Sequence, residues 1–158
     1  VTPIYYKPES VLTVAQTVKL SAALHQMQTT GRVTLTNGGT HWYDNYVNYA
    51  VVNGLIESTY QRKSSEVMNA PVTRAEFVHI LSGALQTSRE INTVNHIPDV
   101  KTGDTYAAEI YEFYRAGILN GSDRLGTFHP ESTIKRSEAA AILYRMFTPT
   151  ARVYISLP

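Results

Sequence analysis

The residues that point most clearly to a binding site are cations at the starts of two expected helices. Arg74 falls in the first turn of one helix, and Lys135 and Arg136 fall in the first turn of another. A helix N-terminus carries partial positive charge and unpaired N–H groups, so a cation there is unfavourable unless an anion binds nearby. Helix amides and a guanidinium together suit a carboxylate or phosphate. The alternative is that both arginines are solvated or paired with carboxylates such as Glu76 and Glu138.

Other candidate contacts are an indole and a turn glycine. Trp42, the only tryptophan, precedes a short helix and is either a core residue or a stacking surface for a sugar, because an indole has an apolar face and a donor edge. Gly121 serves a glycine-rich turn first, and close approach of the backbone to a ligand second. The candidate ligand contacts are therefore Arg74, Arg136, Trp42, Lys135 and Gly121, supported by Glu76 and Glu138 as capping and orienting groups.

The sequence lacks the residue patterns that several kinds of catalytic, metal-binding and nucleic-acid-binding sites require. The chain has no cysteine, its five histidines show no metal-ligand spacing, and it contains neither a serine nucleophile elbow nor a phosphate-binding glycine loop. The net charge is +1 with no run of Lys and Arg, which argues against nucleic acid. No apolar run approaches the length that spans a bilayer. We therefore expect a non-catalytic protein that uses no metal or cofactor and does not insert into a membrane.

The elements that must position these residues are all helical. At 158 residues and 43% hydrophobic content, the chain suits one globular domain. Apolar residues recur at helical spacing, and Thr13 with Gln16 and Thr73 with Glu76 have the capping-box pattern of a helix start. The predicted helices cover residues 12–28, 43–53, 72–86, 104–116 and 134–147. Residues 57–70 and 87–103 are expected as loops, residues 1–11 as a loop or extended arm, and residues 152–157 as a tail or short strand.

Two of these helix pairs align with each other, so the chain contains an internal repeat. Residues 45–56 align with 108–119, and residues 72–85 align with 134–147. Residues 12–25 match the same long helix a third time. The complete copy runs Gly117-Ile118-Leu119-Asn120-Gly121, then Gly126-Thr127-Phe128-His129-Pro130, then Ile134-Lys135-Arg136-Ser137-Glu138. The preceding copy gives Val72-Thr73-Arg74-Ala75-Glu76 at its helix start.

These motifs resemble S-layer homology domains, the modules that hold surface proteins on the walls of many bacteria. The resemblance implies an all-α fold of three repeats around a pseudo-threefold central helix bundle, in a single domain over residues 1–158. The second half of repeat 1 would lie in residues 1–28, repeat 2 in 41–86, repeat 3 in 97–148 and a tail in 149–158. The short helix of repeat 1 would lie upstream in the parent chain, or another segment or a second copy would cover the exposed surface by self-association.

The resemblance also implies a function at the bacterial cell surface, outside the cell. That function is non-covalent binding of a secondary cell-wall polysaccharide, often bearing pyruvate ketals, in grooves between repeats. By position, the anion-binding role of the family's arginine falls on Arg74 and Arg136, and the groove tryptophan corresponds to Trp42. The alternative is a structural or protein-interaction domain that kept the fold and lost its affinity for the glycan.

The copies depart from the family pattern in ways that bear on function. Val14 replaces the arginine in the first copy, Glu57-Ser58 stand where the third copy has Asn120-Gly121, and Thr105 stands where the second has Trp42. We therefore expect at most two intact binding sites among three.

Overall fold

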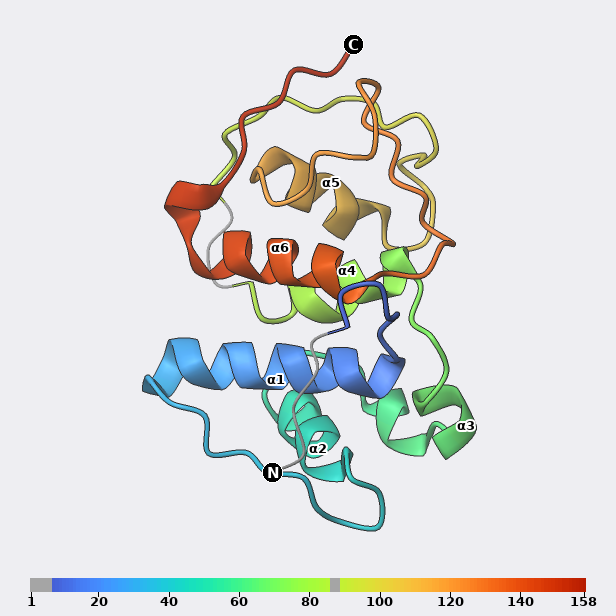
Figure 1. Cartoon of the computed structure of the whole chain (residues 1–158), viewed down its shortest axis with the longest axis vertical. Coiled ribbons are helices and arrows are strands. Elements are labelled where there is room, and N and C mark those ends of the chain that lie inside the picture. The colour runs from blue at the N-terminus through green and yellow to red at the C-terminus, as the bar shows by residue number, and fades with distance from the viewer. Residues whose placement is uncertain (1–6, 86–88) are drawn as a thin grey trace.

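The chain is all helical in its computed structural model, which describes residues 7–85 and 89–158 (Figure 1). The helices are α1 (Val14–Thr30), α2 (Asp44–Val52), α3 (Ser65–Met68), α4 (Arg74–Ser82), α5 (Ala107–Arg115) and α6 (Arg136–Phe147). Two short 3-10 helices are η1 (Ser58–Arg62) and η2 (Pro149–Ala151). Within the described residues the extended contacts are isolated bridges rather than strands, so the predicted all-α class is confirmed.

The long helices begin at their predicted caps. The Thr13 side chain accepts from the Gln16 amide at 3.1 Å, and the Gln16 side chain accepts from the Thr13 amide at 3.0 Å, which completes the predicted capping box. At the start of α4 only half of the box forms, because Thr73 accepts from the Glu76 amide while the Glu76 carboxylate accepts instead from the Tyr60 hydroxyl at 2.7 Å. The α6 cap position is Lys135, which offers no side-chain acceptor.

The segments that lead into the three long helices meet one another pairwise. Isolated antiparallel bridges join Val11 to Lys135, and Thr13 to Pro71. A third bridge joins Thr73 to Thr133 and closes the set. Each segment therefore contacts both of the others.

The first amide of each long helix is satisfied by a carbonyl of a neighbouring segment. The Arg74 amide donates to the Ser132 carbonyl at 2.7 Å, and the Arg136 amide donates to the Ser10 carbonyl at 2.9 Å. The Val14 amide donates to the carbonyl of Ala70 at 3.0 Å. Residues 7–11 thus supply a carbonyl acceptor for the first amide of α6, as residues 130–132 do for the first amide of α4. Sequence reasoning treated residues 1–11 only as an arm and missed this role.

Short helices pack against the long ones in layers. In Figure 1, α1 and α6 run across the middle with α4 behind α6, while α2 and α3 lie beyond α1 and α5 lies beyond α6. The α1 helix packs against both α2 and α4, and α4 packs against α5. The largest fully buried side chains fill the core between these layers, and they include Tyr114, Phe77, Phe113, Phe128 and Met68.

Two connections differ from their predictions. Residues 57–70 are not a plain loop, because η1 and α3 form there and Ser64 caps α3 by accepting from the Val67 amide. The α4 helix ends at Ser82, short of the predicted residue 86, which lies outside the described residues. At Gly83 a side chain would collide with the Leu55 carbonyl, so the helix end is pressed against the preceding turn.

The C-terminal tail is extended and pairs with the body of the fold without forming a strand. The Val153 amide donates to the Gly117 carbonyl at 2.9 Å. The buried Asn92 side chain donates to the Val153 carbonyl and accepts from the Ile155 amide, both at 2.9 Å. The tail is thereby held beside the turn that ends α5.

Candidate functional site

A cleft of about 220 Å³ lies between the start of α4, the turn after α5 and one face of α6. We call it the Arg74 cleft. Three residues singled out from the sequence line it, namely Arg74, Gly121 and Glu138. The other lining residues are Leu119, Asn120, Ala141, Ile142 and Arg145.

The Arg74 guanidinium is held firmly at the wall of this cleft. Its side chain is only 12% exposed and forms an ion pair through Nη1 with Oε2 of Glu138. Its Nε donates to the Phe128 carbonyl at 2.8 Å, and its central carbon lies 5.1 Å from the centroid of the Phe128 ring. The carboxylate that pairs with Arg74 is therefore that of Glu138 on α6, and not that of Glu76 on the same helix as Arg74.

The backbone amides at the start of α4 do not face an open anion site. The Arg74 amide donates to Ser132, and the Ala75 amide donates to the Pro130 carbonyl at 3.0 Å. The next amide of the first turn, that of Glu76, is capped by Thr73. An anion in the Arg74 cleft would therefore meet side-chain donors, since the amides that the sequence argument invoked are already bonded.

Arg145 is a second cation of the cleft that sequence reasoning did not identify. Its Nη1 donates to the Ile118 carbonyl at 3.2 Å, at the edge of the turn that carries Gly121. The signal was the spacing from Glu138, because residues seven apart share one face of a helix. The cleft thus holds two guanidinium groups and one carboxylate.

The turn around Gly121 is built by backbone geometry and one carboxylate. Gly121 has φ of +80°, and a side chain there would collide with the backbone of Gly126, so its first predicted role as a turn residue is confirmed. Asp123 accepts from the Thr127 hydroxyl at 2.7 Å and from two backbone amides. The hydrogen bonds from Thr127 hold the pKa of Asp123 below its usual value.

A second carboxylate fixes the carbonyl that holds Arg74. Asp99 accepts from the Phe128 amide at 2.9 Å and from the His129 amide at 2.7 Å. His129 has φ of +61°, and this local bend carries the chain from Phe128 towards the start of α4. The sequence showed the Phe-x-Pro step but gave no indication that Asp99 would hold it.

The remaining predicted contacts lie outside the Arg74 cleft. Lys135 pairs with Glu9 at 2.7 Å in an exposed position, and this partner raises the pKa of Lys135. The Arg136 Nε is buried with no hydrogen-bond partner among the described residues. Trp42 is half-buried with its ring edge-on to Tyr43, and Lys19 of α1 lies 5.9 Å from its ring centroid.

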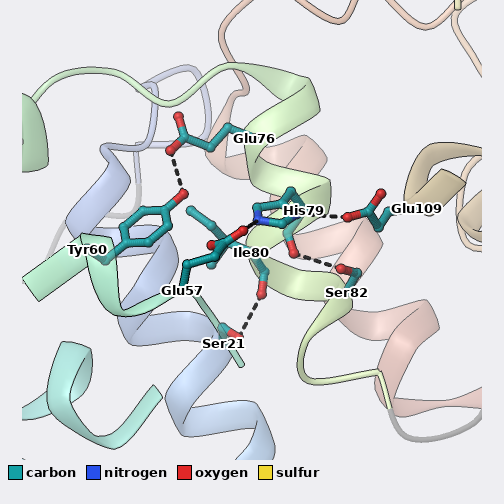
Figure 2. A network of polar contacts seen from close by, with 8 residues as sticks. All are labelled: Ser21, Glu57, Tyr60, Glu76, His79, Ile80, Ser82 and Glu109. Carbon is teal, nitrogen blue, oxygen red and sulfur yellow. Dashed lines mark hydrogen bonds and ion pairs between the residues drawn. The ribbon is translucent and has the colours of Figure 1, made fainter. Parts of the chain in front are cut away.

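A polar network on α4, which the sequence did not suggest, links its neighbours (Figure 2). The Nε2 atom of His79 lies 2.7 Å from Glu57, and its Nδ1 atom lies 2.8 Å from Glu109 of α5. Because both ring nitrogens face carboxylates, only the doubly protonated ring can donate to both. The Tyr106 ring stacks on the imidazole with centroids 4.0 Å apart. His79 thus joins the turn after α2 to α5.

Glu76 belongs to the same region and not to the Arg74 cleft (Figure 2). Its carboxylate accepts from the Tyr60 hydroxyl, and burial together with this hydrogen bond raises the pKa of Tyr60. The structure therefore places Glu76 and Glu138, which align with each other in the sequence, in different environments.

Two further findings concern metal binding and membrane spans in residues 7–85 and 89–158. No cluster of three His, Asp or Glu side chains has an arrangement suited to a metal ion. The helices there are too short or too polar to cross a bilayer.

Comparison with known proteins finds one family model that matches part of the chain and two similar proteins. Residues 96–140 match the family model described as the S-layer homology domain. The chain is 33% identical over 97 residues to an amylopullulanase of Thermoanaerobacterium thermosulfurigenes, an alignment that covers 61% of this chain and 5% of that protein. It is 31% identical over 97 residues to exoglucanase XynX of Acetivibrio thermocellus, covering 61% of this chain and 8% of that protein.

The matched stretch contains α5, the turn at Gly121, the Phe128 carbonyl and the first turn of α6. Four of the eight residues that line the Arg74 cleft lie within it, whereas Arg74 and Arg145 lie outside it. Domains of this family bind cell-wall polymers at the bacterial surface and are not catalytic. The similarity to S-layer homology domains is therefore established for residues 96–140, which make up less than half of the chain.

Proposed function

We propose that this chain anchors its parent protein non-covalently to a bacterial cell wall by binding an acidic secondary cell-wall polysaccharide, such as a pyruvylated one, in the Arg74 cleft. The observation that carries the proposal is the meeting of Arg74 and Arg145 in a 220 Å³ cleft next to the S-layer homology match. Lys135, Arg136 and Trp42, which lie outside the cleft, are proposed as separate contacts for the same polymer. Gly121 would let the polymer approach the backbone of the turn.

The geometry suggests how a sugar carboxylate would be recognised. Within the described residues, the hydrogen bonds of Arg74 use Nε and Nη1 and leave Nη2 for a ligand. The Phe128 carbonyl and ring hold the guanidinium in place, so a ligand need not order it. Glu138 would oppose an acidic ligand at Nη2 by like-charge repulsion, so its carboxylate should weaken binding.

A structural or protein-interaction role is the second candidate, and one observation favours it. Arg74 already has a carboxylate partner in Glu138 and an acceptor in Phe128. In this candidate the guanidinium joins α4 to α6 and binds no ligand. The first candidate predicts that loss of the Glu138 carboxylate strengthens wall binding, whereas the second predicts that it changes only stability.

The deciding experiment measures sedimentation of the protein with purified bacterial cell-wall sacculi, before and after extraction of the secondary polysaccharide. Arg74→Gln should weaken binding about tenfold, because one charge-assisted contact is lost. Glu138→Gln should strengthen binding, because the competing carboxylate is removed. Arg62→Gln is the matched control, since Arg62 is exposed on η1 and its loss changes the net charge equally.

Loss of binding on extraction, with the two variants changing in opposite directions, would support the proposal. Equal loss in Arg74→Gln and Arg62→Gln would indicate nonspecific attraction to the wall. If the folded protein does not sediment with intact sacculi, and both cleft variants alter only thermal stability, the structural candidate stands.

A further inference from the structure

We propose that a pocket between the start of α2 and η1 binds an uncharged N-acetylated sugar unit. The pocket has a volume of about 350 Å³, and we call it the α2–η1 pocket. It shares no lining residue with the Arg74 cleft, so the inference goes beyond the proposed function and does not depend on it. The residues that matter most in its walls are His41, Tyr43, Val47, Asn48, Gln61 and Lys63.

The walls of this pocket are polar but carry little net charge. Among the described residues that line it, Val47 alone lacks a polar side-chain atom. The Asp44 carboxylate accepts from the His41 amide at 2.9 Å and lies 3.5 Å from the His41 ring nitrogen Nδ1. The Lys63 ammonium lies 4.9 Å from the centroid of the Tyr60 ring. Because one carboxylate and one ammonium offset each other, the pocket suits a polar, uncharged ligand better than an ion.

The Tyr43 hydroxyl is a donor that the protein leaves without a partner. Tyr43 is only 4% exposed, and its ring stacks on His41 and meets Trp42 edge-on. Its hydroxyl has no hydrogen-bond partner among the described residues and yet is not sealed from solvent. Burial, followed by the nearby Asp44 carboxylate, raises the pKa of Tyr43, so the hydroxyl keeps its proton at neutral pH. A ligand oxygen in the pocket would give this donor its partner.

Two side-chain amides in the same pocket are arranged to complement a third amide. The Gln61 Nε2 donates to the Asn48 Oδ1 at 3.1 Å and ties η1 to α2. This bond leaves an acceptor on Gln61 and a donor on Asn48 without partners among the described residues. If both amides were turned over, one donor and one acceptor would still remain. A secondary amide has one carbonyl acceptor and one N–H donor, which is the group that an acetamido substituent places on a sugar ring.

A peptide also carries secondary amides, but the rest of the pocket favours a sugar. The Tyr43 hydroxyl, the Lys63 ammonium and the Thr40 hydroxyl are further donors in the lining, and they suit the closely spaced hydroxyls of a sugar ring. The side chain of a peptide residue would meet little apolar surface beyond Val47. The volume of about 350 Å³ is within the range of small-ligand sites.

A cavity at the corresponding place beside α5 provides an internal comparison. Its volume is about 330 Å³, and its lining includes Ile110, which aligns with Val47 in the repeat. Asp104, which aligns with His41, and Glu131 make this second cavity acidic, and no side-chain amide lines it among the described residues. The same place in the repeat therefore lacks the groups on which the proposed specificity depends.

The test titrates the 158-residue chain with three small probes and follows its backbone amides by NMR. N-acetylglucosamine should shift the amides of residues 40–48 and 60–63, with a dissociation constant of about 1 mM for so small a ligand. Glucose, which lacks the acetamido group, should bind about fivefold or more weakly. N-acetylalanine methylamide, a peptide unit without a sugar ring, should also bind more weakly. The amides of residues 100–110 and 130–131 should not respond.

A matched pair of tyrosine variants separates ligand binding from folding. Tyr43→Phe should weaken binding of N-acetylglucosamine about three- to tenfold without lowering the melting temperature, because no partner in the protein loses a donor. Tyr46→Phe is the control, since the Tyr46 hydroxyl donates to Asn37 at 2.8 Å and Tyr46 does not line the pocket. It should lower the melting temperature and leave sugar binding unchanged. Gln61→Met removes the amide pair and should abolish the preference over glucose.

The proposal is overturned if N-acetylglucosamine leaves the amides of residues 40–48 and 60–63 unshifted, or if glucose binds equally well. Unchanged affinity in Tyr43→Phe would also contradict it. Tighter binding of N-acetylalanine methylamide would assign the pocket to a peptide instead of a sugar. None of these titrations uses cell-wall sacculi or the Arg74 cleft, so a failure here would leave the proposed wall anchoring untouched, and a failure of wall sedimentation would leave this proposal untouched.

Discussion

Arg74 on α4 and Glu138 on α6 form an ion pair that joins the two helices. The two residues were expected to serve the same kind of site in separate repeats, yet the structure makes them partners. The pair lies beside the Phe128 carbonyl, which also accepts from Arg74. The contribution of this ion pair to stability can be measured by unfolding, independently of any effect on wall binding.

Replacing Arg74 should destabilise the fold as well as the cleft. Arg74→Ala should lower the free energy of unfolding by about 1–3 kcal/mol, because the buried Phe128 carbonyl and Glu138 lose their donor. Glu138 is 39% exposed, so Glu138→Ala should cost less. Urea unfolding of both single variants and the double variant should give a coupling energy of about 1 kcal/mol. Strict additivity would mean that the pair contributes nothing.

The turn after α5 should tolerate a side chain less well than the equivalent turn after α2. Gly117 and Gly54 have φ of +76° and +70°, so alanine is strained at both. A side chain at Gly117 would lie 2.6 Å from the Val153 carbonyl oxygen, whereas the space beside Gly54 is open. Gly54→Ala should cost about 1 kcal/mol and Gly117→Ala about 2–4 kcal/mol by thermal unfolding. Equal costs would show that the tail does not pack on this turn.

His79 should stabilise the junction between the turn after α2 and α5. His79→Ala leaves the Glu57 and Glu109 carboxylates without a shared donor and removes the stack on Tyr106. We expect a loss of about 1–3 kcal/mol in urea unfolding. Glu57→Gln is a useful comparison, because Glu57 is more than half exposed and its loss should be smaller. A variant of His79 within about 0.5 kcal/mol of the parent would contradict this role.

Tyr60 should make the fold sensitive to alkali. Burial and the hydrogen bond to Glu76 raise the pKa of Tyr60 above its ordinary value of 10.0, so the folded state keeps a proton that the unfolded chain releases. The contribution is complete below pH 10 and is lost as the pH rises through the folded pKa. Above pH 10 the free energy of unfolding should fall by about 1.4 kcal/mol per pH unit for this group.

The check on Tyr60 is a pair of urea titrations between pH 8 and 11. Tyr60→Phe should be less stable than the parent by about 1 kcal/mol at pH 8, since the Glu76 carboxylate loses a donor. Its decline above pH 10 should be shallower, because one titrating group is absent. Parallel curves would show that Tyr60 ionises equally in both states.

Local patterns in the sequence predicted the helix class and most helix starts, because caps and apolar spacing are short-range signals. Thr13 and Thr73 stand at the predicted starts for this reason. The helix within residues 57–70 was missed since its apolar residues are too few to show a period. The early end of α4 depends on the contact between Gly83 and Leu55, which no local pattern reveals.

The candidate site was predictable in part. Arg74, Gly121 and Glu138 come from one recurring motif, and the structure brings them to one cleft. The pairing of Arg74 with Glu138 could not be predicted from the sequence, because the two residues lie 64 positions apart on different helices. Trp42 and Lys135 were drawn from the same motif but lie elsewhere, since the copies diverge around them.

The pairwise bridges between the three helix starts have a consequence for folding kinetics. Because Val11 contacts Lys135, the set closes only when the two ends of the chain have come together. A linear array of repeats can fold and fray one unit at a time. A closed set must instead meet the entropic cost of one very long loop before its final contacts form. We therefore expect this chain to fold slowly and in a single cooperative step, and to lose order at all three repeats together when residues 7–11 are detached.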